Sequence, residues 1–313
     1  MNRSLDRAGA LQAPVPLVCP ACRSGVLVQQ GDQLYCGHCS REYSFCDGYP
    51  DLIIGERFED EMSCGQLCYE EEANSDTTLN YWLPLFQRLW PEPDRPPRLL
   101  SVGCGSGLDV DLLSEHGFDV MGIDPGNRSC LWRQRKQQSR LLLANGMHMP
   151  FADNSFDAAF CGCVFPHVGV IGDSNQVRED VFQQRTELAR EMVRVLRPGG
   201  RIIVSSPNRW FPLDLFHGRE PGDYLPRLNP LWSRFLLSRG DYARLFEAAG
   251  AGRVRSLPVE RYWGFVGSRH SLKGRLLSLP VRFLFWLVSR PAMSWLRGSP
   301  VNPWIIVMGE KLQ

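Results

Sequence analysis

The stretch SVGCGSGLDVDLL, residues 101–113, decides the fold of this chain. Three glycines, Gly103, Gly105 and Gly107, alternate there with small residues. The apolar run RLLSV leads into them, and a pattern typical of a helix follows. A glycine turn between a strand and a helix lets the backbone approach a nucleotide-like ligand. The sequence therefore predicts such a ligand at the end of a strand.

Short apolar runs continue on both sides of this turn. RLLSV, FDVMGID, RLLLAN, SFDAAFCG and GRIIVSSP are each followed by a turn signal, and most of the intervals can hold a helix. This alternation predicts βαβ units and a parallel sheet, an α/β fold. Two last strands are expected within GRVRSLPVERYW and PWIIVMGEKL. DYARLFEAAG predicts a helix with Asp241 as N-cap and Gly250 as terminator.

The bulk composition limits the possibilities. The 313 residues allow two or three domains, and 43% hydrophobic residues is typical of a globular protein. The 35 basic and 34 acidic residues give no global attraction to nucleic acid. The N-terminus lacks the apolar core of a signal peptide, and no apolar run reaches the roughly 18 residues of a membrane span. We expect a cytoplasmic protein whose eleven cysteines bind metal or stay reduced.

Four cysteines form two knuckles. CPAC and CGHC place Cys19, Cys22, Cys36 and Cys39 in two C-x-x-C pairs, thirteen residues apart. Two facing knuckles complete a tetrahedron of thiolates around Zn²⁺, with no open position, so the pattern predicts a structural zinc site. Iron in a rubredoxin-like site, free thiols, and His38 as a replacement ligand are the alternatives.

The domain organisation follows from these patterns. We expect a disordered N-terminus over 1–16, a zinc-ribbon-like module over 17–58, and a helical or linker segment over 59–97 that ends in PEPDRPPR. A large α/β domain then spans 98–313, with insertions at 206–240 and 264–302.

The glycine spacing narrows the ligand. A dinucleotide fingerprint is G-x-G-x-x-G, but Leu108 stands at its third glycine, and no P-loop Lys-Ser/Thr follows. Asp124 comes nineteen residues after Gly105, at the end of FDVMGID. A carboxylate there can accept hydrogen bonds from both hydroxyls of a ribose. The spacing thus favours a ribose-bearing ligand without a pyrophosphate.

Over about residues 98–250 the chain resembles the class I S-adenosylmethionine (SAM)-dependent methyltransferases of the small-molecule group. LLSVGCGSG, GIDP, ANGMHMPFADNSFDAAFC and LAREMVRVLRPGGRIIVSSPN are similar to four motifs of that family in the same order. The resemblance implies a Rossmann-like sheet with a final antiparallel strand inserted near its edge.

The resemblance also assigns cofactor contacts. It implies that Gly103, Gly105 and Gly107 wrap the methionine part and that Asp124 binds the ribose. Pro125 and Met147 would flank the adenine, with Asn145 and Gly146 at its edge, while Cys161 and Gly162 would face the sulfonium. His167 matches a histidine common after that strand, either as a catalytic base or as a residue that shapes the pocket.

Two positions depart from the family pattern. Ser101 stands where the family usually has Asp or Glu, so it cannot pair with the ammonium group of the cofactor in the same way. Asn145 stands where the family often has Asp, although its side-chain oxygen still accepts a hydrogen bond. Both remain assigned to the cofactor site.

The two insertions should leave the sheet at the ligand face, because ligands bind beyond the carboxyl ends of parallel strands. The first insertion carries the substrate-binding candidates Trp210, Phe211, Asp214, His217 and Tyr224. Its aromatic content favours an apolar acceptor. The alternatives for both insertions are additional core or a homodimer surface.

The second insertion lies in a basic region. Residues 253–297 contain nine Lys and Arg and one acidic residue, Glu260, a net charge of +8. Interleaved with them is LLSLPVRFLFWLVSRPAMSWL, which suits the surface of an anionic membrane and would make the protein peripheral to it. RNA phosphates or a buried helix with solvated arginines are the alternatives.

We therefore expect a SAM-dependent methyltransferase with a structural zinc site that acts on a small apolar acceptor such as a natural product, lipid or quinone-like molecule. A ribosomal-RNA base methyltransferase whose zinc ribbon contacts RNA is one alternative. A non-catalytic partner subunit is the other.

Overall fold

The computed structural model describes residues 15–55, 64–171, 176–214, 227–262 and 272–313. Its centre is a seven-stranded sheet in the order β13-β14-β10-β9-β6-β7-β8. The strands are β6 (Arg98–Val102), β7 (Asp119–Asp124), β8 (Leu141–Leu143), β9 (Phe156–Gly162), β10 (Leu196–Pro207), β13 (Ala251–Ser256) and β14 (Trp304–Lys311). The expected α/β sheet is confirmed.

Six strands of the sheet run in one direction, and the seventh, β14, is antiparallel to both of its neighbours, β10 and β13. The antiparallel strand implied by the family resemblance is thus present near the edge. The central strands read as continuous apolar runs because both faces of the sheet are covered. In β7 every residue after Asp119 is buried.

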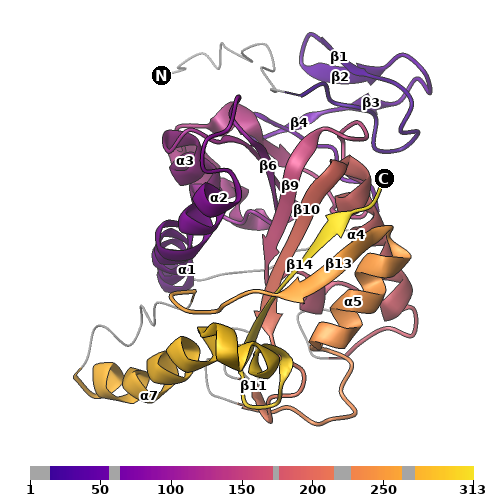
Figure 1. The fold of residues 1–313 in the computed structure, drawn as a ribbon. Helices are drawn as coiled ribbons and strands as arrows, with labels where there is room; N and C mark the ends of the chain where they lie inside the picture. The colour runs from indigo at the N-terminus through magenta and orange to yellow at the C-terminus, as the bar shows by residue number, and fades with distance from the viewer. Residues whose placement is uncertain (1–14, 56–63, 172–175, 215–226, 263–271) are drawn as a thin grey trace.

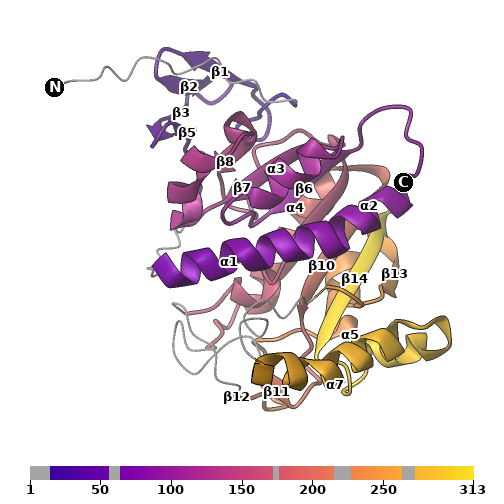
Figure 2. The same ribbon diagram turned by 90° about the vertical axis from the view of Figure 1, so that its left-hand side faces the viewer.

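Helices cover the two faces. On one face lie α1 (Cys64–Thr77), the π-helical turn η1 (Thr78–Trp82), α2 (Leu83–Leu89) and α3 (Leu108–Glu115). On the other lie α4 (Val181–Val195) and α5 (Arg239–Ala248) (Figure 1). Two short 3-10 helices follow strands at the ligand face, η2 (Asn127–Gln134) after β7 and η4 (Phe165–His167) after β9, while η3 (Gln138–Arg140) leads into β8 at the opposite end of the sheet. Figure 2 shows α1 crossing in front of the sheet.

The helix α5 corrects one detail of the sequence prediction. Its N-cap is Ser238, whose side chain accepts a hydrogen bond from the backbone amide of Asp241, while Asp241 bonds back to the amide of Ser238. Asp241 is therefore the N3 residue of a capping box and not the N-cap. Gly250 does end the helix, in the left-handed conformation at φ +89°.

A small N-terminal module sits at one end of the sheet. It contains β1 (Leu27–Gln30), β2 (Gln33–Cys36) and β3 (Glu42–Tyr43), followed by the hairpin β4 (Phe45–Cys46) and β5 (Tyr49–Pro50). It contacts residues 150 and 151, which precede β9, so it lies at the amino ends of the parallel strands. The chain then extends the sheet beside β8, where the amide of Leu52 donates to the carbonyl of Leu143.

The opposite end carries the two insertions. The first contains β11 (Leu213–Asp214) paired with β12 (Arg227–Leu228), and the second contains α7 (Leu272–Ser289) and η5 (Pro291–Gly298). Asn208, directly after β10, donates to the carbonyls of Ser299 and Asn302. Both insertions therefore meet at the carboxyl ends of the parallel strands, and both views place them far from the N-terminal module (Figures 1 and 2).

Candidate cofactor site and cysteine cluster

The glycine turn between β6 and α3 has the backbone shape that its sequence predicts. Gly103, Gly105 and Gly107 have φ angles of +69°, +52° and +73°, a region that side chains other than glycine disfavour. A Cβ atom on Gly103 would lie 2.5 Å from the side chain of Val164, whereas one on Gly105 would meet only the Arg128 side chain, at 3.4 Å. The turn at Gly105 thus leaves the backbone open to a ligand.

Asp124 ties this turn to the end of β7. Its two carboxylate oxygens accept hydrogen bonds from the amides of Gly105 and Gly126, at 2.9 and 2.7 Å. Burial raises the pKa of the Asp124 carboxyl above its ordinary value, and these amides oppose that shift. Each oxygen keeps a second lone pair, so the carboxylate can still accept hydrogen bonds from vicinal hydroxyls.

A tryptophan that the sequence interpretation overlooked supports the turn. The fully buried Trp132, in η2, donates from its indole Nε1 to the carbonyl oxygen of Gly105 at 2.7 Å. Tyr49 of the N-terminal module packs edge-on against it, with ring centroids 4.9 Å apart. Next to Gly105, the side chain of Arg128 forms an ion pair of 2.7 Å with Glu70 of α1. Elements distant in sequence thus enclose the turn.

The residues assigned to the adenine lie beyond β8. The side-chain oxygen of Asn145 accepts from the amide of Met147 at 2.9 Å, and its nitrogen donates to the carbonyl of Ile54 at 3.3 Å. Asn145 is buried, while Gly146, Met147 and Pro125 are partly exposed. The segment that leaves the N-terminal module therefore borders the predicted adenine edge, which no sequence motif indicated.

The carboxylate missing at position 101 is present nearby in space. The hydroxyl of Ser101 donates to the carboxylate of Asp109, the second residue of α3, at 2.5 Å. Burial raises the pKa of Asp109 to about 6, against hydrogen bonds from Ser101 and Val110 that lower it. Asp109 can thus carry a negative charge beneath the turn at neutral pH. The sequence signal was an acidic residue two positions after the last glycine.

The end of β9 presents the groups assigned to the reacting face. Cys161 is buried and burial raises the pKa of its thiol, so it stays protonated. Gly162 is exposed. His167 is partly exposed in η4 and packs edge-on against Phe235, with centroids 5.9 Å apart. These positions suit a site at the carboxyl ends of the strands. Both roles that the sequence allows for His167, a catalytic base and a residue that shapes the pocket, fit this geometry.

A buried arginine fixes the loop that carries His167. Arg185 of α4 donates to the carbonyls of Pro166 and Val168 on one side and of Arg234 and Phe235 on the other. It is 4% exposed, and burial lowers the pKa of its guanidinium to about 10, so it stays charged. Four carbonyl dipoles thereby hold the loop after β9 against the first insertion.

Two tyrosine–serine pairs line the adjacent strand end. The hydroxyl of Tyr262 bonds to that of Ser205, and the hydroxyl of Tyr242 donates to Ser206 at 2.9 Å. Burial raises the pKa of both tyrosines, so both are neutral. Neither tyrosine can serve as a phenolate base near neutral pH.

The substrate-binding candidates are partly separated. Trp210 is exposed, and the guanidinium of Arg209 lies 5.3 Å from its ring centroid. Phe211 is partly exposed. Asp214 is buried and paired with Arg227 at 3.0 Å, which indicates a structural role between β11 and β12. His217 and Tyr224 lie outside the described residues.

The four predicted cysteine ligands come together. The sulfur atoms of Cys19, Cys22, Cys36 and Cys39 lie within 4.8 Å of one another, and two of the pairs are 3.6 Å apart. A tetrahedral site with Zn–S bonds of about 2.3 Å requires sulfurs about 3.8 Å apart, so the cluster fits zinc. His38 is not a member of the cluster.

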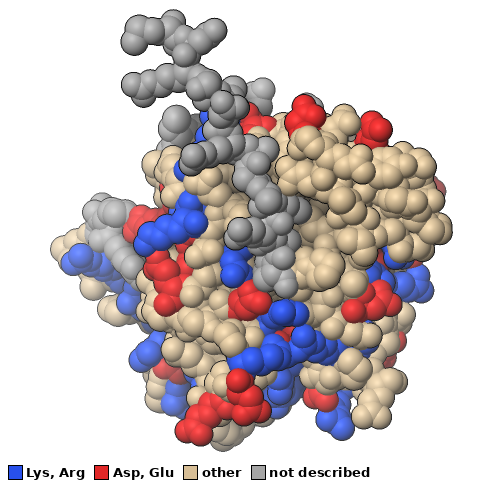
Figure 3. Space-filling model, turned by 90° about the horizontal axis from the view of Figure 1, so that it is seen from above, with Lys and Arg blue, Asp and Glu red and all other residues tan. Residues whose placement is uncertain are grey.

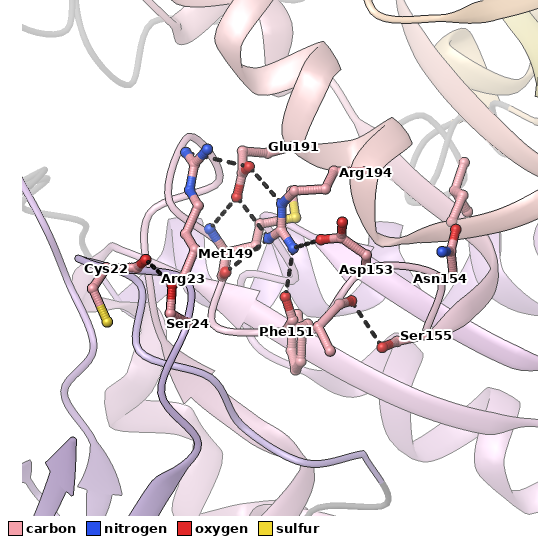
Figure 4. Close-up of polar contacts among 12 residues, drawn as sticks. Cys22, Arg23, Ser24, Met149, Phe151, Asp153, Asn154, Ser155, Glu191 and Arg194 are labelled. Atoms are coloured by element: carbon pink, nitrogen blue, oxygen red, sulfur yellow. Dashed lines mark hydrogen bonds and ion pairs between the residues drawn. The ribbon is translucent and has the colours of Figure 1, made fainter. Parts of the chain in front are cut away.

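The module packs firmly on the sheet domain. The side chain of Glu191, which is 2% exposed, joins the two parts (Figure 4). It forms ion pairs with Arg23, the residue directly after Cys22, at 3.3 Å and with Arg194 at 2.8 Å. It also accepts a hydrogen bond from the backbone amide of Met149. Leu17 and Leu34 share one apolar core cluster with the sheet. The cysteine cluster therefore lies at the end of the sheet opposite the ligand face.

The fold and the site define a Rossmann-like, class I SAM-dependent methyltransferase domain. Residues 100–204 match the family model described as a methyltransferase domain, and this part of the chain belongs to that family. The expected family is thereby confirmed, and the N-terminal cluster of four cysteines is consistent with a zinc-binding module.

Individual relatives cover only part of the chain. Over 119 residues it is 32% identical to the O-methyltransferase rstn1 of Aspergillus nomiae, across 36% of this chain and 47% of that protein. Over 118 residues it is 31% identical to demethylmenaquinone methyltransferase of Corynebacterium kroppenstedtii, across 38% and 44%. The chain thus spans less than half the length of these relatives.

A solved structure is similar in fold at low sequence identity. It is the phosphoethanolamine N-methyltransferase 2 of Haemonchus contortus in complex with SAM. The match has a TM-score of 0.44 and 15% identity, and it covers 77% of this chain and 57% of the other.

Proposed function

We propose that the protein transfers a methyl group from SAM to a small apolar acceptor and that zinc in the four-cysteine cluster has a structural role. The observation that carries the cofactor assignment is the Asp124 carboxylate, which is buried at the end of β7 and bonded to Gly105 of the open turn. SAM would supply an activated methyl group when bound. The three glycines, Asp124 and the turn from Asn145 to Met147 would hold it.

Positioning supports the transfer more than acid–base chemistry does. Aligning the acceptor atom with the methyl group lowers the barrier without a proton transfer. Cys161, Tyr242 and Tyr262 are held neutral by burial, and Arg185 fixes the loop of His167. His167 remains the candidate base if the acceptor must lose a proton. The relation to demethylmenaquinone methyltransferase makes a quinol-like acceptor a reasonable first choice.

The RNA alternative is disfavoured by charge. Residues 15–55, which include the cysteine cluster, contain two basic side chains, Arg23 and Arg41, and four acidic ones. Figure 3, which looks onto this end of the molecule, shows acidic and basic side chains interspersed. A module that reads RNA phosphates needs a basic surface.

The experiment is a transfer assay with two matched acceptors. Purified protein is incubated with SAM and either a 1,4-naphthoquinol or the smaller, more polar 1,4-benzenediol, whose hydroxyls have the same para arrangement, and S-adenosylhomocysteine is quantified by mass spectrometry. The naphthoquinol is the apolar acceptor. We expect more product with the naphthoquinol. Cofactor binding without product from any acceptor of either kind would instead favour a non-catalytic partner subunit.

A further inference from the structure

The helix α7 is apolar on two opposite faces. One face packs into the core through Phe285 and Val288, which are 2% and 0% exposed. On the other, Leu272, Leu276, Leu279, Phe283 and Trp286 are between 44% and 74% exposed. Their spacing of four, three, four and three residues keeps them within about 80° around the helix, at about 100° per residue. We call these five residues the apolar stripe.

The flank of the stripe is positively charged. Arg275 and Arg282 are exposed and lie on the same side of the stripe, because they are seven residues apart. Arg290, which pairs with Glu260, places its guanidinium 5.0 Å from the ring centroid of Trp286. The sequences of α7 and η5 contain no aspartate or glutamate. This surface therefore combines apolar contact with affinity for anions.

Further exposed apolar residues lie at the same end. Leu228, Leu231 and Trp232 of the first insertion are 78%, 63% and 83% exposed, and Trp295 of η5 is 72% exposed. Both ribbon views place β11 beside α7, and Figure 2 also shows β12 there (Figures 1 and 2). Exposed apolar side chains gathered at one end of a molecule are typical of an interaction surface. This area borders the ligand face.

We propose that the apolar stripe docks on an anionic lipid surface, with the ligand face of the domain turned toward the bilayer. Leucine and aromatic side chains enter the interfacial region, and the arginines of the flank bind lipid phosphates. The part of the chain that the structure describes contains no helix with the length and hydropathy of a membrane span.

A second copy of the chain fits this surface less well. In a two-fold symmetric dimer the same patch faces itself. Arg275 and Arg282 would then approach their own copies across the two-fold axis, and this juxtaposition of like charges is unfavourable. An anionic lipid surface offers apolar contact to the stripe and phosphate groups to the arginines on its flank.

The test is vesicle co-sedimentation of the full chain without cofactor. Vesicles of phosphatidylcholine with phosphatidylglycerol are compared with phosphatidylcholine alone, at low salt and at about 1 M salt, where the Debye length falls to about 3 Å. We expect binding to the anionic vesicles only, reduced at high salt. Arg275→Glu with Arg282→Glu should weaken it about thirtyfold or more, which corresponds to about 1 kcal/mol for each of the two arginines removed.

Apolar contact is tested separately. Phe283→Ser with Trp286→Ser should also weaken binding about tenfold, because two large apolar side chains no longer enter the interface. Val26→Ser with Val28→Ser is the matched control, since both valines are 54% exposed at the opposite end. Arg88→Glu, an exposed arginine at the end of α2, controls for charge reversal. Neither control should change binding.

Three results would overturn the proposal. The first is that the wild type does not bind anionic vesicles. The second is that the variant with Phe283→Ser and Trp286→Ser binds them as strongly as the wild type does. The third is that the wild type binds no vesicles but forms a dimer in sedimentation equilibrium, which the same substitutions dissociate. If the docked protein takes its acceptor from the bilayer, that step rests on the proposed methyltransferase function. Docking on the lipid surface does not depend on that function. Calorimetric binding of S-adenosylhomocysteine to the same variants reports the cofactor site, so the two failures can be distinguished.

Discussion

The indole nitrogen of Trp132 donates a hydrogen bond to the carbonyl oxygen of Gly105, which fixes the turn of the cofactor site from a separate element. The donor lies 27 residues after the acceptor, in η2, and its ring is fully buried. Tyr49 of the N-terminal module packs on that ring. A side chain outside the glycine motif thus determines where the backbone of the motif lies.

Trp132→Phe should therefore weaken both the fold and the site. A partly buried acceptor left without its donor costs about 1 kcal/mol or more. We expect a lower free energy of unfolding in urea and a several-fold higher dissociation constant for S-adenosylhomocysteine by calorimetry. Trp232→Phe, at a tryptophan that is 83% exposed, is the control and should change neither. An unchanged dissociation constant for Trp132→Phe would remove this residue from the site.

Two glycines of the turn should respond differently to alanine. Both have positive φ, so each substitution costs about 1–2 kcal/mol of backbone strain. At Gly103 the new methyl group would also meet Val164 at 2.5 Å, which adds about 1–3 kcal/mol of overpacking. Urea denaturation should therefore show Gly103→Ala to be the less stable variant.

The second substitution Val164→Ala removes the clash and should restore part of the stability of Gly103→Ala but not of Gly105→Ala. Equal stabilities of the two single variants, or no rescue, would show that the turn does not have this shape.

Asp109 predicts a pH dependence of stability with a definite sign. Its pKa is about 6 in the folded protein against 3.8 for the unperturbed group, so between these values the folded state binds more protons than the unfolded state. The contribution of Asp109 to stability is therefore full below about pH 4 and is lost as the pH rises through 6, on the order of 3 kcal/mol.

Asp109→Asn removes this titration while the amide oxygen still accepts from Val110. The stability of the variant relative to the wild type should rise between about pH 4 and 6.5 in chemical denaturation. The difference between the two proteins cancels titrations that they share. A difference that stays flat over this range would mean that Asp109 titrates normally.

Metal removal should affect more than the module. Leu17, Leu34 and Cys36 pack in the same core cluster as Phe151, and Glu191 joins the module to α4. We expect one equivalent of zinc by elemental analysis and a loss of zinc in Cys36→Ser, with a lower melting temperature of the sheet domain. Cys46→Ser, an exposed cysteine outside the cluster, should keep both. Metal content well below one equivalent, with four reactive thiols, would contradict the zinc assignment.

The sequence predicted the features that local patterns encode. The strands, the glycine turn, Asp124 and the cysteine pairs are contiguous motifs whose geometry follows from spacing, and the four sulfurs meet as expected. Contacts between distant segments left no such pattern. Neither the position of Trp132 beneath Gly105 nor the ion pair of Glu70 with Arg128 can be read from residues so far apart.

The charge of the second insertion also needed the fold. The net charge of +8 counts arginines whose charges have structural partners, because Arg253 pairs with Glu310 and Arg290 with Glu260. Arg297 donates to the carbonyls of Val288 and Ser289. Fewer positive charges therefore flank the apolar stripe in the folded protein than the net charge of the sequence suggested.

The central claim is that Asp124 and the glycine turn form a SAM site, and calorimetric titration with S-adenosylhomocysteine tests it most directly. Asp124→Ala should weaken binding by about 1.5–3 kcal/mol, the cost of losing hydrogen bonds to a charged group. Asp94→Ala, at an exposed aspartate in the segment before β6, is the control and should bind as the wild type does. Unchanged affinity in the Asp124 variant, or binding of NAD in place of S-adenosylhomocysteine by the wild type, would contradict the account.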